Sequence, residues 1–542
     1  RQVKIVERLG HADGQSNISA IAVHENGIPD TFSKESLVDA DGADEVALEG
    51  RIDLRNIPFV TIDGADARDF DDAVWAEPDP NVDGGWHIIV AIADVSWYVR
   101  PGSPLDHDAR ERGNSVYFPD RVIPMLPEAL SNGLCSLRPG ENRPCLAVHM
   151  WIAPDGGLTR HTFVRGLMKS TARLTYSEVQ TAHDGRPDGQ TASLMATVIE
   201  PLYGAFETLL KSRNYRSPLE LDIPERHIEV ADDGTVCSII ERERLDSHRL
   251  IEEFMITANV AAAETLEKQC QPCMYRIHDR PSNEKADALN QFLYSLDLQF
   301  SKGQVPQPRL LNQILSSVVG QPEAHMVNQM ILRSQAQAEY SPNNISHFGL
   351  ALRRYAHFTS PIRRYADLLV HRALVSGLKL GAGGLDNHGE DFEDLAGHIS
   401  ATERRAAKAE RDAVDRFTAL YLTDQIGAEF AARVNGVSRA GLFVTLQETG
   451  ADGLVPIRTL PNDYYDHDPI LHTLTGTSHG IVFSLGQELE VRLEEAIPLT
   501  GGLIMTLVGG EQTAMPNRPE RGKNHVSGRR RGPKRRRGRR RS

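Results

Sequence analysis

Five aspartates fall within ten residues of the sequence, in a pattern that could hold metal ions. The segment reads Val60-Thr-Ile-Asp63-Gly-Ala-Asp66-Ala-Arg-Asp69-Phe-Asp71-Asp72-Ala-Val74. Unpaired like charges about 4 Å apart repel by about 4 kcal/mol near a protein surface, so a fold that gathers them needs a cation. Oxygen ligands in such numbers suit Mg²⁺ or Mn²⁺ rather than Zn²⁺. Two such ions could activate water and stabilise an in-line phosphoryl displacement.

The same cluster has a plainer interpretation as an acidic surface loop, and the aspartates alone do not decide between the two. An EF-hand is excluded, because alanines stand where its loop needs oxygen ligands. The flanking Val-Thr-Ile and Ala-Val-Trp predict a strand on each side of a turn. In that geometry Asp69 and Asp71 share one strand face. Asp72 points the other way unless the strand ends there, and Asp63 returns from the preceding strand.

A second segment, between Arg353 and Tyr365, interleaves four arginines with two tyrosines and a phenylalanine. Arginine binds phosphate oxygens through two hydrogen bonds, and aromatic rings stack nucleobases at about 1–3 kcal/mol each. Taken alone, the segment could also be a basic amphipathic helix with a structural Arg–Asp pair. The aspartate cluster in the same chain favours the nuclease interpretation, because a nuclease needs both parts.

Four further residues have ordinary structural interpretations when each is taken singly. Tyr117 and Tyr176 could stack on bases, although a lone tyrosine is more often part of a core. Glu253 and Glu410 fall on predicted helices, where pairing with an arginine is the default.

The surrounding pattern predicts how these residues are positioned. From Arg51 to about Gly166, short apolar runs interrupted by Gly, Pro and Asp predict strands. From Ser177 the apolar spacing becomes helical, with clear periods at 250–261 and 367–374. A charged, Ala-rich stretch at 402–424 predicts a long helix.

The C-terminal part of the chain changes character again. Residues 428–509 contain short β-rich runs separated by glycines, which is typical of a small closed barrel such as an OB-fold. The Pro-, Gly- and Arg-rich residues 510–542 predict disorder. At the other end, residues 1–10 alternate like a strand and residues 11–50 predict a linker. The fold class is therefore α+β, with strands and helices at 51–424 and a barrel at 425–509.

Charge and composition restrict the partners. Residues 521–542 contain 12 of the 60 Lys and Arg residues and no acid. Residues 1–520 therefore contain 48 basic and all 74 acidic residues, which gives them a net charge of −26. An acidic body repels polyanions on average, so nucleic-acid binding must come from basic patches, metal ions or the tail. No apolar run approaches about 18 residues, so no membrane span is expected.

The cysteines and histidines predict neither a disulfide framework nor a zinc site. The chain has five cysteines, and the lone Cys270-Gln-Pro-Cys273 lacks further ligands at zinc-site spacing. His248 and His278 are interpreted as hydrogen-bonded polar residues. We expect reduced thiols, a cytoplasmic location and a monomer.

At these residues the sequence resembles the ribonuclease II/ribonuclease R family. The similarity extends from about Arg51 to Leu374 and continues through the predicted barrel, which resembles an RNA-binding domain of the ribosomal-protein-S-one type. Its Arg-rich tail favours the ribonuclease R branch. Six ordered motifs carry the resemblance: Thr61-Ile-Asp-Gly with Asp69-Phe-Asp-Asp-Ala73, Ile123-Pro-Met-Leu-Pro127 with Leu134-Cys-Ser-Leu137, Leu250-Ile-Glu-Glu-Phe-Met255, Tyr275-Arg-Ile-His278, His347-Phe-Gly349 and Ala356-His-Phe-Thr-Ser-Pro-Ile-Arg-Arg-Tyr365.

The resemblance implies a processive 3′-to-5′ exoribonuclease that hydrolyses single-stranded RNA to nucleoside 5′-monophosphates with Mg²⁺ or Mn²⁺. Residues 51–424 would be its catalytic RNB domain, an antiparallel sheet with surrounding helices, and residues 1–10 the remnant of a cold-shock domain. By position, the metal-holding carboxylates are matched by Asp63, Asp69, Asp71 and Asp72, of which Asp71 also helps to position the attacking water.

The same resemblance implies roles in RNA binding. Arg363 matches the arginine that grips the scissile phosphate, and Glu410 matches a glutamate near it. Tyr117 matches one half of a clamp on the terminal base, and Tyr176 and Glu253 match further RNA contacts. Leu221 stands where many members carry a phenylalanine, which puts the other half of the clamp in doubt.

Three functions remain open on this basis. The first is an active exonuclease, favoured because all four motif aspartates and Arg363 are present. The second is a catalytically silent RNA-binding regulator on the same scaffold. The third is an acidic scaffold whose basic tail binds partners, which explains the charge asymmetry but not the aspartate cluster. The tail could contact RNA, the ribosome or other RNA-decay factors, or simply be solvated.

Overall fold

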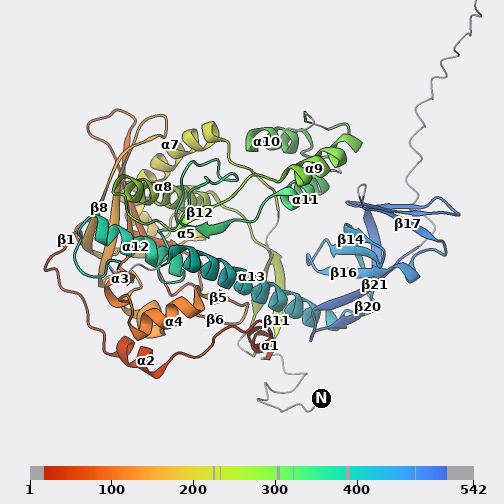
Figure 1. The fold of residues 1–542 in the computed structure, drawn as a ribbon, viewed down its shortest axis with the longest axis horizontal. Helices are drawn as coiled ribbons and strands as arrows, with labels where there is room; N and C mark the ends of the chain where they lie inside the picture. The colour runs from red at the N-terminus through yellow and green to blue at the C-terminus, as the bar shows by residue number, and fades with distance from the viewer. Residues whose placement is uncertain are drawn as a thin grey trace, which may run out of the picture.

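The computed structural model describes residues 17–509, except 224–225, 232, 299, 302–304, 322, 386–390 and 470–471. The predicted strand at 1–10 and the predicted disordered tail at 510–542 lie outside the described residues. The chain forms a sheet-and-helix body and a barrel, with the long helix α13 (Phe392–Thr423) running between them (Figure 1). Among the described residues, no helix combines the length and the apolar composition that a bilayer crossing requires.

A seven-stranded sheet forms the centre of the body, in the order β1-β8-β7-β4-β3-β2-β9. The inner pairs are antiparallel, as predicted, whereas β1 pairs with β8 and β2 pairs with β9 in parallel. The sheet is therefore mixed. Its strands are Ile52–Asp53 (β1), Val60–Asp63 (β2), Asp72–Pro78 (β3), Trp86–Ala93 (β4), Asn142–Ile152 (β7), Leu158–Lys169 (β8) and Ala172–Thr175 (β9).

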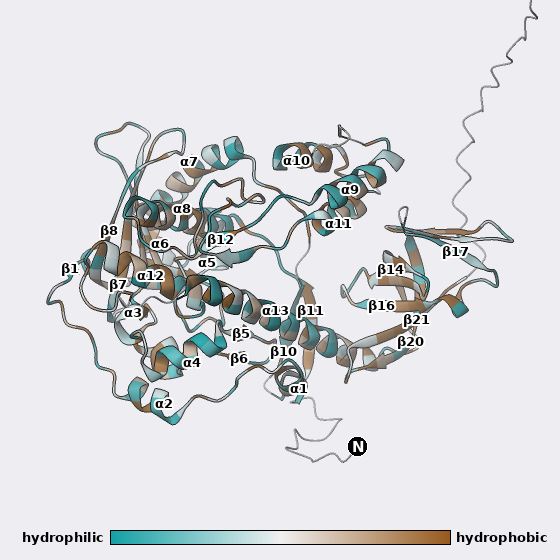
Figure 2. Ribbon diagram, in the orientation of Figure 1, coloured by the Kyte–Doolittle hydropathy of each residue, from teal (hydrophilic) through white to brown (hydrophobic). Residues whose placement is uncertain are grey.

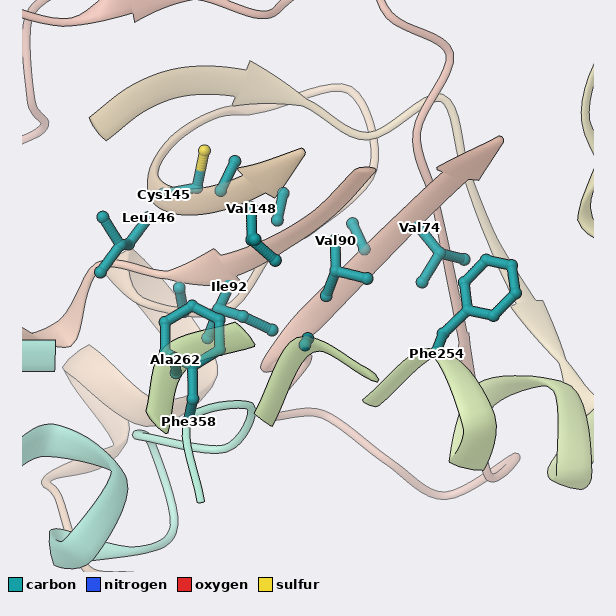
Figure 3. Packing of buried hydrophobic residues seen from close by; sticks show 14 of the residues in the cluster. Val74, Val90, Ile92, Cys145, Leu146, Val148, Phe254, Ala262 and Phe358 are labelled. Atoms are coloured by element: carbon teal, nitrogen blue, oxygen red, sulfur yellow. The ribbon is translucent and has the colours of Figure 1, made fainter. Parts of the chain in front are cut away.

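The composition of the central strands explains why the sheet is covered. Six of the eight residues of β4 are buried, and an almost continuous apolar run is typical of a strand that is covered on both faces. One layer of this cover is α8 (Asp246–Lys268): Figure 3 shows Val74 near Phe254 of α8, and Phe358 near Ala262. This packing fixes the ends of β3 and β4, where Asp72 pairs with Ile92.

The predicted helices are confirmed, with different bounds. The periodic segments at 250–261 and 367–374 lie in α8 and in α12 (Tyr365–Gly377). The charged stretch at 402–424 belongs to α13 (Phe392–Thr423), which starts earlier because Asp391 caps it by accepting the N–H of Glu393 at 2.9 Å. Figure 2 shows hydrophobic and hydrophilic residues alternating along α13, as expected for a helix with one buried face.

Residues 17–50, predicted as linker, contain two helices: α1 (Ile18–Glu25) and α2 (Lys34–Asp41). Ile18, Ala22 and Val23 of α1 are buried in a small cluster that includes Ala409 and Ala413 of α13. This burial stabilises a helix that is too short and too weakly periodic to be recognised from its sequence.

The region from 51 to 166, predicted as strands, also contains short helices. Their presence reflects tertiary packing rather than a long apolar repeat. The remaining elements of the body are α3 (Val95–Tyr98), α4 (Pro104–Arg112), β5 (Val116–Tyr117), β6 (Val122–Ile123), a π-helix at Ala129–Leu134, α5 (Tyr176–His183), α6 (Thr191–Leu194), a π-helix at Met195–Ile199, α7 (Glu200–Arg216), β10 (Arg226–Val230), β11 (Val236–Glu241), β12 (Tyr275–Ile277), α9 (Asn283–Ser295), α10 (Pro308–Ser317), α11 (Ala324–Ser334) and β13 (Glu339–Ser341).

The C-terminal part is a closed five-stranded barrel in the order β14-β15-β16-β21-β20, as predicted. Arg226 of the β10–β11 hairpin ties it to the body by donating to the carbonyl oxygens of Glu448 and Gln447. A small sheet, β17-β18-β19, was not predicted. The elements of this part are Glu429–Ser438 (β14), Gly441–Leu446 (β15), Asp452–Pro456 (β16), a 3₁₀ helix at Ile457–Thr459, Tyr465–Asp468 (β17), Thr473–Gly476 (β18), Val482–Ser484 (β19), Glu488–Ile497 (β20) and Gly502–Leu507 (β21).

Candidate active site

The aspartate segment lies at one end of the central sheet, in the connection between two neighbouring strands. Strand β2 ends at Asp63 and β3 begins at Asp72, and the residues between them form an irregular loop. The prediction that Asp69 and Asp71 share a strand face is therefore wrong, because both precede β3. The turn still brings the end of β2 and the start of β3 to the same end of the sheet. The negative charge of Asp72 therefore raises the pKa of Asp63.

This loop, residues 64–71, is held by contacts that the sequence analysis did not find. Arg173 donates to two consecutive carbonyl oxygens at its start, those of residues 64 and 65, at 2.7 Å each. Near its end, the Ser136 hydroxyl donates to the carbonyl of Arg68 at 2.8 Å and accepts the N–H of Phe70 at 3.0 Å. Ser136 thus positions the acids. The Leu134–Leu137 motif was the only signal for it.

Asp71 is the most enclosed of the four acids, with an exposed fraction of 4%. Its Oδ1 accepts the N–H of Ile362 at 2.8 Å. Its Oδ2 is buried without a hydrogen-bond partner, and the nearest cation is the Nε of Arg363 at 3.8 Å. Burial raises the pKa of Asp71 well above its usual range, and the charge of Arg363 only partly opposes the rise.

Asp63 and Asp72 show the same imbalance between burial and compensation. Burial, reinforced by the charges of Asp72 and Asp69, raises the pKa of Asp63 to about 8. Burial also raises the pKa of Asp72 to about 6, although Arg363 and Arg364 oppose it. The Oδ2 atom of Asp63 is buried without a hydrogen-bond partner.

These acids fit a hard divalent cation. The two unpartnered buried oxygens, on Asp63 and Asp71, are carboxylate oxygens, which Mg²⁺ and Mn²⁺ prefer. Within the described residues, however, no three His, Cys, Asp or Glu side chains already form a metal-binding group. A cation here would need further ligands, such as water or substrate oxygens. The assignment of all four aspartates as metal ligands stays a prediction.

Arg363 faces the acids from the segment before α12. Its side chain is 42% exposed, and its Nη2 donates to the Ser360 hydroxyl at 3.0 Å. Its backbone carbonyl accepts the N–H of Ser115 at 3.0 Å, and Asn114 and Arg364 form a bridge of β type. An exposed guanidinium on a fixed backbone can bind an anion beside Asp71.

Tyr117 and Glu410 belong to the same site. The Tyr117 hydroxyl donates to Oδ2 of Asp69 at 2.9 Å, and its backbone N–H donates to Oε1 of Glu410 at 2.8 Å. Burial raises the pKa of Glu410. A cavity of about 320 Å³ opens between these residues and α13, and Arg363 lines it as well.

Of the other predicted RNA contacts, the structure brings only Tyr176 to the acids. Burial and the charges of Asp72 and Asp63 raise its pKa, and its ring stacks on His248 at a centroid distance of 4.1 Å. Glu253 is 2% exposed and is bound by Arg213, with Arg216 at 3.6 Å. Its default interpretation as the partner of an arginine is confirmed.

The remaining predictions near the site have mixed outcomes. His278 accepts the N–H of Gly349 at 2.9 Å and contacts the carbonyl of Ala336, which confirms that it is a hydrogen-bonded polar residue. His248 accepts the N–H of Leu245 at 3.2 Å, with the same conclusion. Leu221 packs against the cluster of α9, α10 and α11. Its place in a base clamp stays a prediction.

Comparison with known proteins places this geometry in a family. The RNB domain model matches residues 51–379, which include the sheet, the aspartate loop and Arg363. The chain belongs to the RNB family. The S1 RNA binding domain model matches residues 423–507, so the barrel of this RNB protein is an S1 domain, as expected.

Two relatives extend the match. The RNB chain is 43% identical over 506 residues to ribonuclease R of Escherichia coli (strain K12). The matched region covers 91% of this chain and 62% of that protein. It therefore spans less than two thirds of that relative's length. A structure described as Mycoplasma genitalium RNase R in complex with ribose methylated single-stranded RNA superposes with a TM-score of 0.86 and 28% identity, over 92% of this chain and 79% of the other.

The RNB fold alone does not decide whether a member is catalytic. Yeast Ssd1, described as a pseudonuclease, shares the fold with a TM-score of 0.70 at 17% identity, over 86% of this chain and 59% of the other. The question of catalysis therefore depends on the residues of the site.

Proposed function

We propose that this chain is a processive 3′-to-5′ exoribonuclease that hydrolyses single-stranded RNA to nucleoside 5′-monophosphates with Mg²⁺ or Mn²⁺. One observation carries the proposal. Asp63 and Asp71 each have a buried carboxylate oxygen without a hydrogen-bond partner, and they lie beside the partly exposed guanidinium of Arg363 and the ring of Tyr117, whose hydroxyl bonds to Asp69. Buried acids whose charge Arg363 only partly compensates, next to a guanidinium that can bind an anion, form a site that a phosphodiester and a cation would complete.

In this proposal the acids provide the metal ligands, drawn from Asp63, Asp69, Asp71 and Asp72. A divalent ion bound there would neutralise the phosphate and make the attacking water more acidic. Asp71, whose carboxylate accepts the N–H of Ile362, would also orient that water.

The remaining residues bind and orient RNA. Arg363 would hold the scissile phosphate, because its guanidinium is exposed and only partly engaged by Ser360. Tyr117 would stack on the terminal base, with Glu410 fixing its backbone. Tyr176 lies close enough to Asp63 and Asp72 for their charges to raise its pKa, and it would contact a second base. Glu253 would act indirectly, by holding Arg213 and Arg216.

The degradation of an end-labelled oligonucleotide tests this proposal. A 5′-labelled single strand incubated with the chain and Mg²⁺ is expected to shorten from its 3′ end and to release mononucleotides. Addition of EDTA should stop the reaction. A strand that is bound but stays intact would favour the catalytically silent regulator instead, and internal cleavage would contradict the exonucleolytic mode.

A further inference from the structure

The side-chain hydroxyl and the backbone N–H of Tyr117 form hydrogen bonds with different parts of the site. Its phenol oxygen lies 2.9 Å from Oδ2 of Asp69, and its backbone N–H is bound by Glu410 on α13. Its strand, β5, pairs with β6, and the neighbouring Phe118 is buried in the cluster that α13 forms with α1. The phenol is therefore presented to Asp69 from a fixed backbone, and 39% of the residue remains exposed.

Asp69 needs such a partner more than the other three acids do. Asp63 and Asp72 belong to strands, and Asp71 is fixed by the N–H of Ile362. Asp69 lies in the irregular loop between them, and the described residues give its carboxylate one side-chain hydrogen bond, the one from Tyr117. An ionised carboxylate can accept about four hydrogen bonds or ligands, so this bond orients Asp69 without using up its oxygens.

We propose that Tyr117 is a positioning residue for a metal ligand: its hydroxyl orients the carboxylate of Asp69 toward the cation. This inference rests on the proposed function and deepens it. The ring and the hydroxyl of one side chain then serve two different tasks, the stacking of the terminal base and the orientation of a metal-binding acid. Binding of an RNA end and binding of the ion are thereby coupled through Tyr117.

The expected size of the effect follows from comparable metal sites. Residues that hydrogen-bond to metal ligands orient them, and their removal typically weakens metal binding by about 10–100-fold. Base stacking depends on the ring face rather than on the hydroxyl. Removal of the hydroxyl alone should therefore separate the two tasks.

The experiment compares Tyr117→Phe with Tyr117→Ala in the full chain. Mn²⁺ binding is measured without RNA, from the electron paramagnetic resonance signal of free Mn²⁺. RNA binding is measured separately in EDTA, where no hydrolysis occurs. Tyr340→Phe is the matched control, because Tyr340 lines the same cavity as Tyr117 but its hydroxyl bonds to His357, at 2.9 Å. Melting temperatures establish that every variant is folded.

Tyr117→Phe is expected to lower the Mn²⁺ affinity about tenfold and to leave RNA binding in EDTA within twofold. Tyr117→Ala should weaken both, and Tyr340→Phe neither. Mn²⁺ affinity of Tyr117→Phe within twofold of the wild type overturns the proposal, as does a wild type that binds no Mn²⁺ without RNA. If the wild type still degrades RNA in a Mg²⁺-dependent way in that case, only this inference fails and the proposed function stands.

Discussion

Asp94 and the acids around the aspartate loop lie close together in the sheet and differ in how the protein compensates their negative charge. Asp94 directly follows β4 and is 1% exposed. Two arginines bind it, Arg51 at 2.8 Å and Arg165 at 2.6 Å and 3.0 Å, and the Ser96 hydroxyl adds a fourth hydrogen bond. Burial alone would raise the pKa of Asp94, but these partners outweigh it and lower the pKa to about 2.

The end of the aspartate loop lies near Asp94 in the same sheet. Asp72, which follows the loop, pairs with Ile92 of β4, two residues before Asp94. There burial dominates, and the pKa values of Asp63 and Asp72 rise to about 8 and about 6. The protein compensates the charge of Asp94 with its own arginines, whereas nearby arginines only partly compensate Asp63 and Asp72. Acids with raised pKa values of this kind mark a candidate functional site.

The largest effect is expected from a change at Asp71, whose buried negative charge is only partly compensated. Asp71→Asn should slow Mg²⁺-dependent degradation by roughly a thousandfold, because it removes a charge that the cation and the attacking water need. RNA binding should stay within a few-fold, as measured by filter binding in EDTA. Asp66→Asn is the matched control: it makes the same charge change in the same loop at an exposed side chain, and its rate should equal that of the wild type.

A change at the compensated group should act on stability instead. Asp94→Ala leaves the two buried guanidinium groups of Arg51 and Arg165 without a counter-charge, which should lower the free energy of unfolding by about 3–5 kcal/mol. Asp53→Ala, which breaks an exposed ion pair with Arg55, should change the free energy of unfolding far less, because solvent screens that pair. Denaturant unfolding measures both. Equal losses would remove the distinction between the buried and the exposed pair.

Asp63→Asn should have the smaller and opposite effect in the absence of metal. The folded-state pKa of Asp63 is raised above the value of an unfolded aspartate, so its ionisation opposes folding as the pH rises from about 4 to about 8. In EDTA at pH 8, Asp63→Asn should therefore be more stable than the wild type by roughly 1–3 kcal/mol. The gain should vanish near pH 4. A loss of stability at pH 8 would show that Asp63 is compensated after all.

The sequence predicted the parts of the site that depend on local patterns. The aspartate segment, the arginine segment, the helices α8 and α12 and the barrel each follow from residue types and periodic spacing. The details that depend on distant contacts were not predictable in this way. Tyr117 is 48 residues from Asp69 and 293 from Glu410, and no periodicity relates them.

The error near the site has a tertiary origin. Asp69 and Asp71 were placed on a strand because their spacing of two matches strand geometry, but Ser136 and Arg173 hold this stretch as a loop. There, tertiary hydrogen bonds outweighed the local pattern. For Glu253 the structure shows the pairing with Arg213 that is the default for a helical glutamate, and the RNA contact that the resemblance implies stays a prediction.

Proton release on metal binding tests the central claim most directly. A metal displaces protons from ligands that are protonated in the free protein, and Asp63, with a pKa of about 8, would still hold its proton at pH 7. Titration calorimetry with Mn²⁺ in buffers of different ionisation enthalpy should therefore show proton release at pH 7 that declines toward pH 9. Mn²⁺ binding without proton release at pH 7 would mean that the acids are already ionised, and would contradict the account of buried acids whose charge the protein only partly compensates.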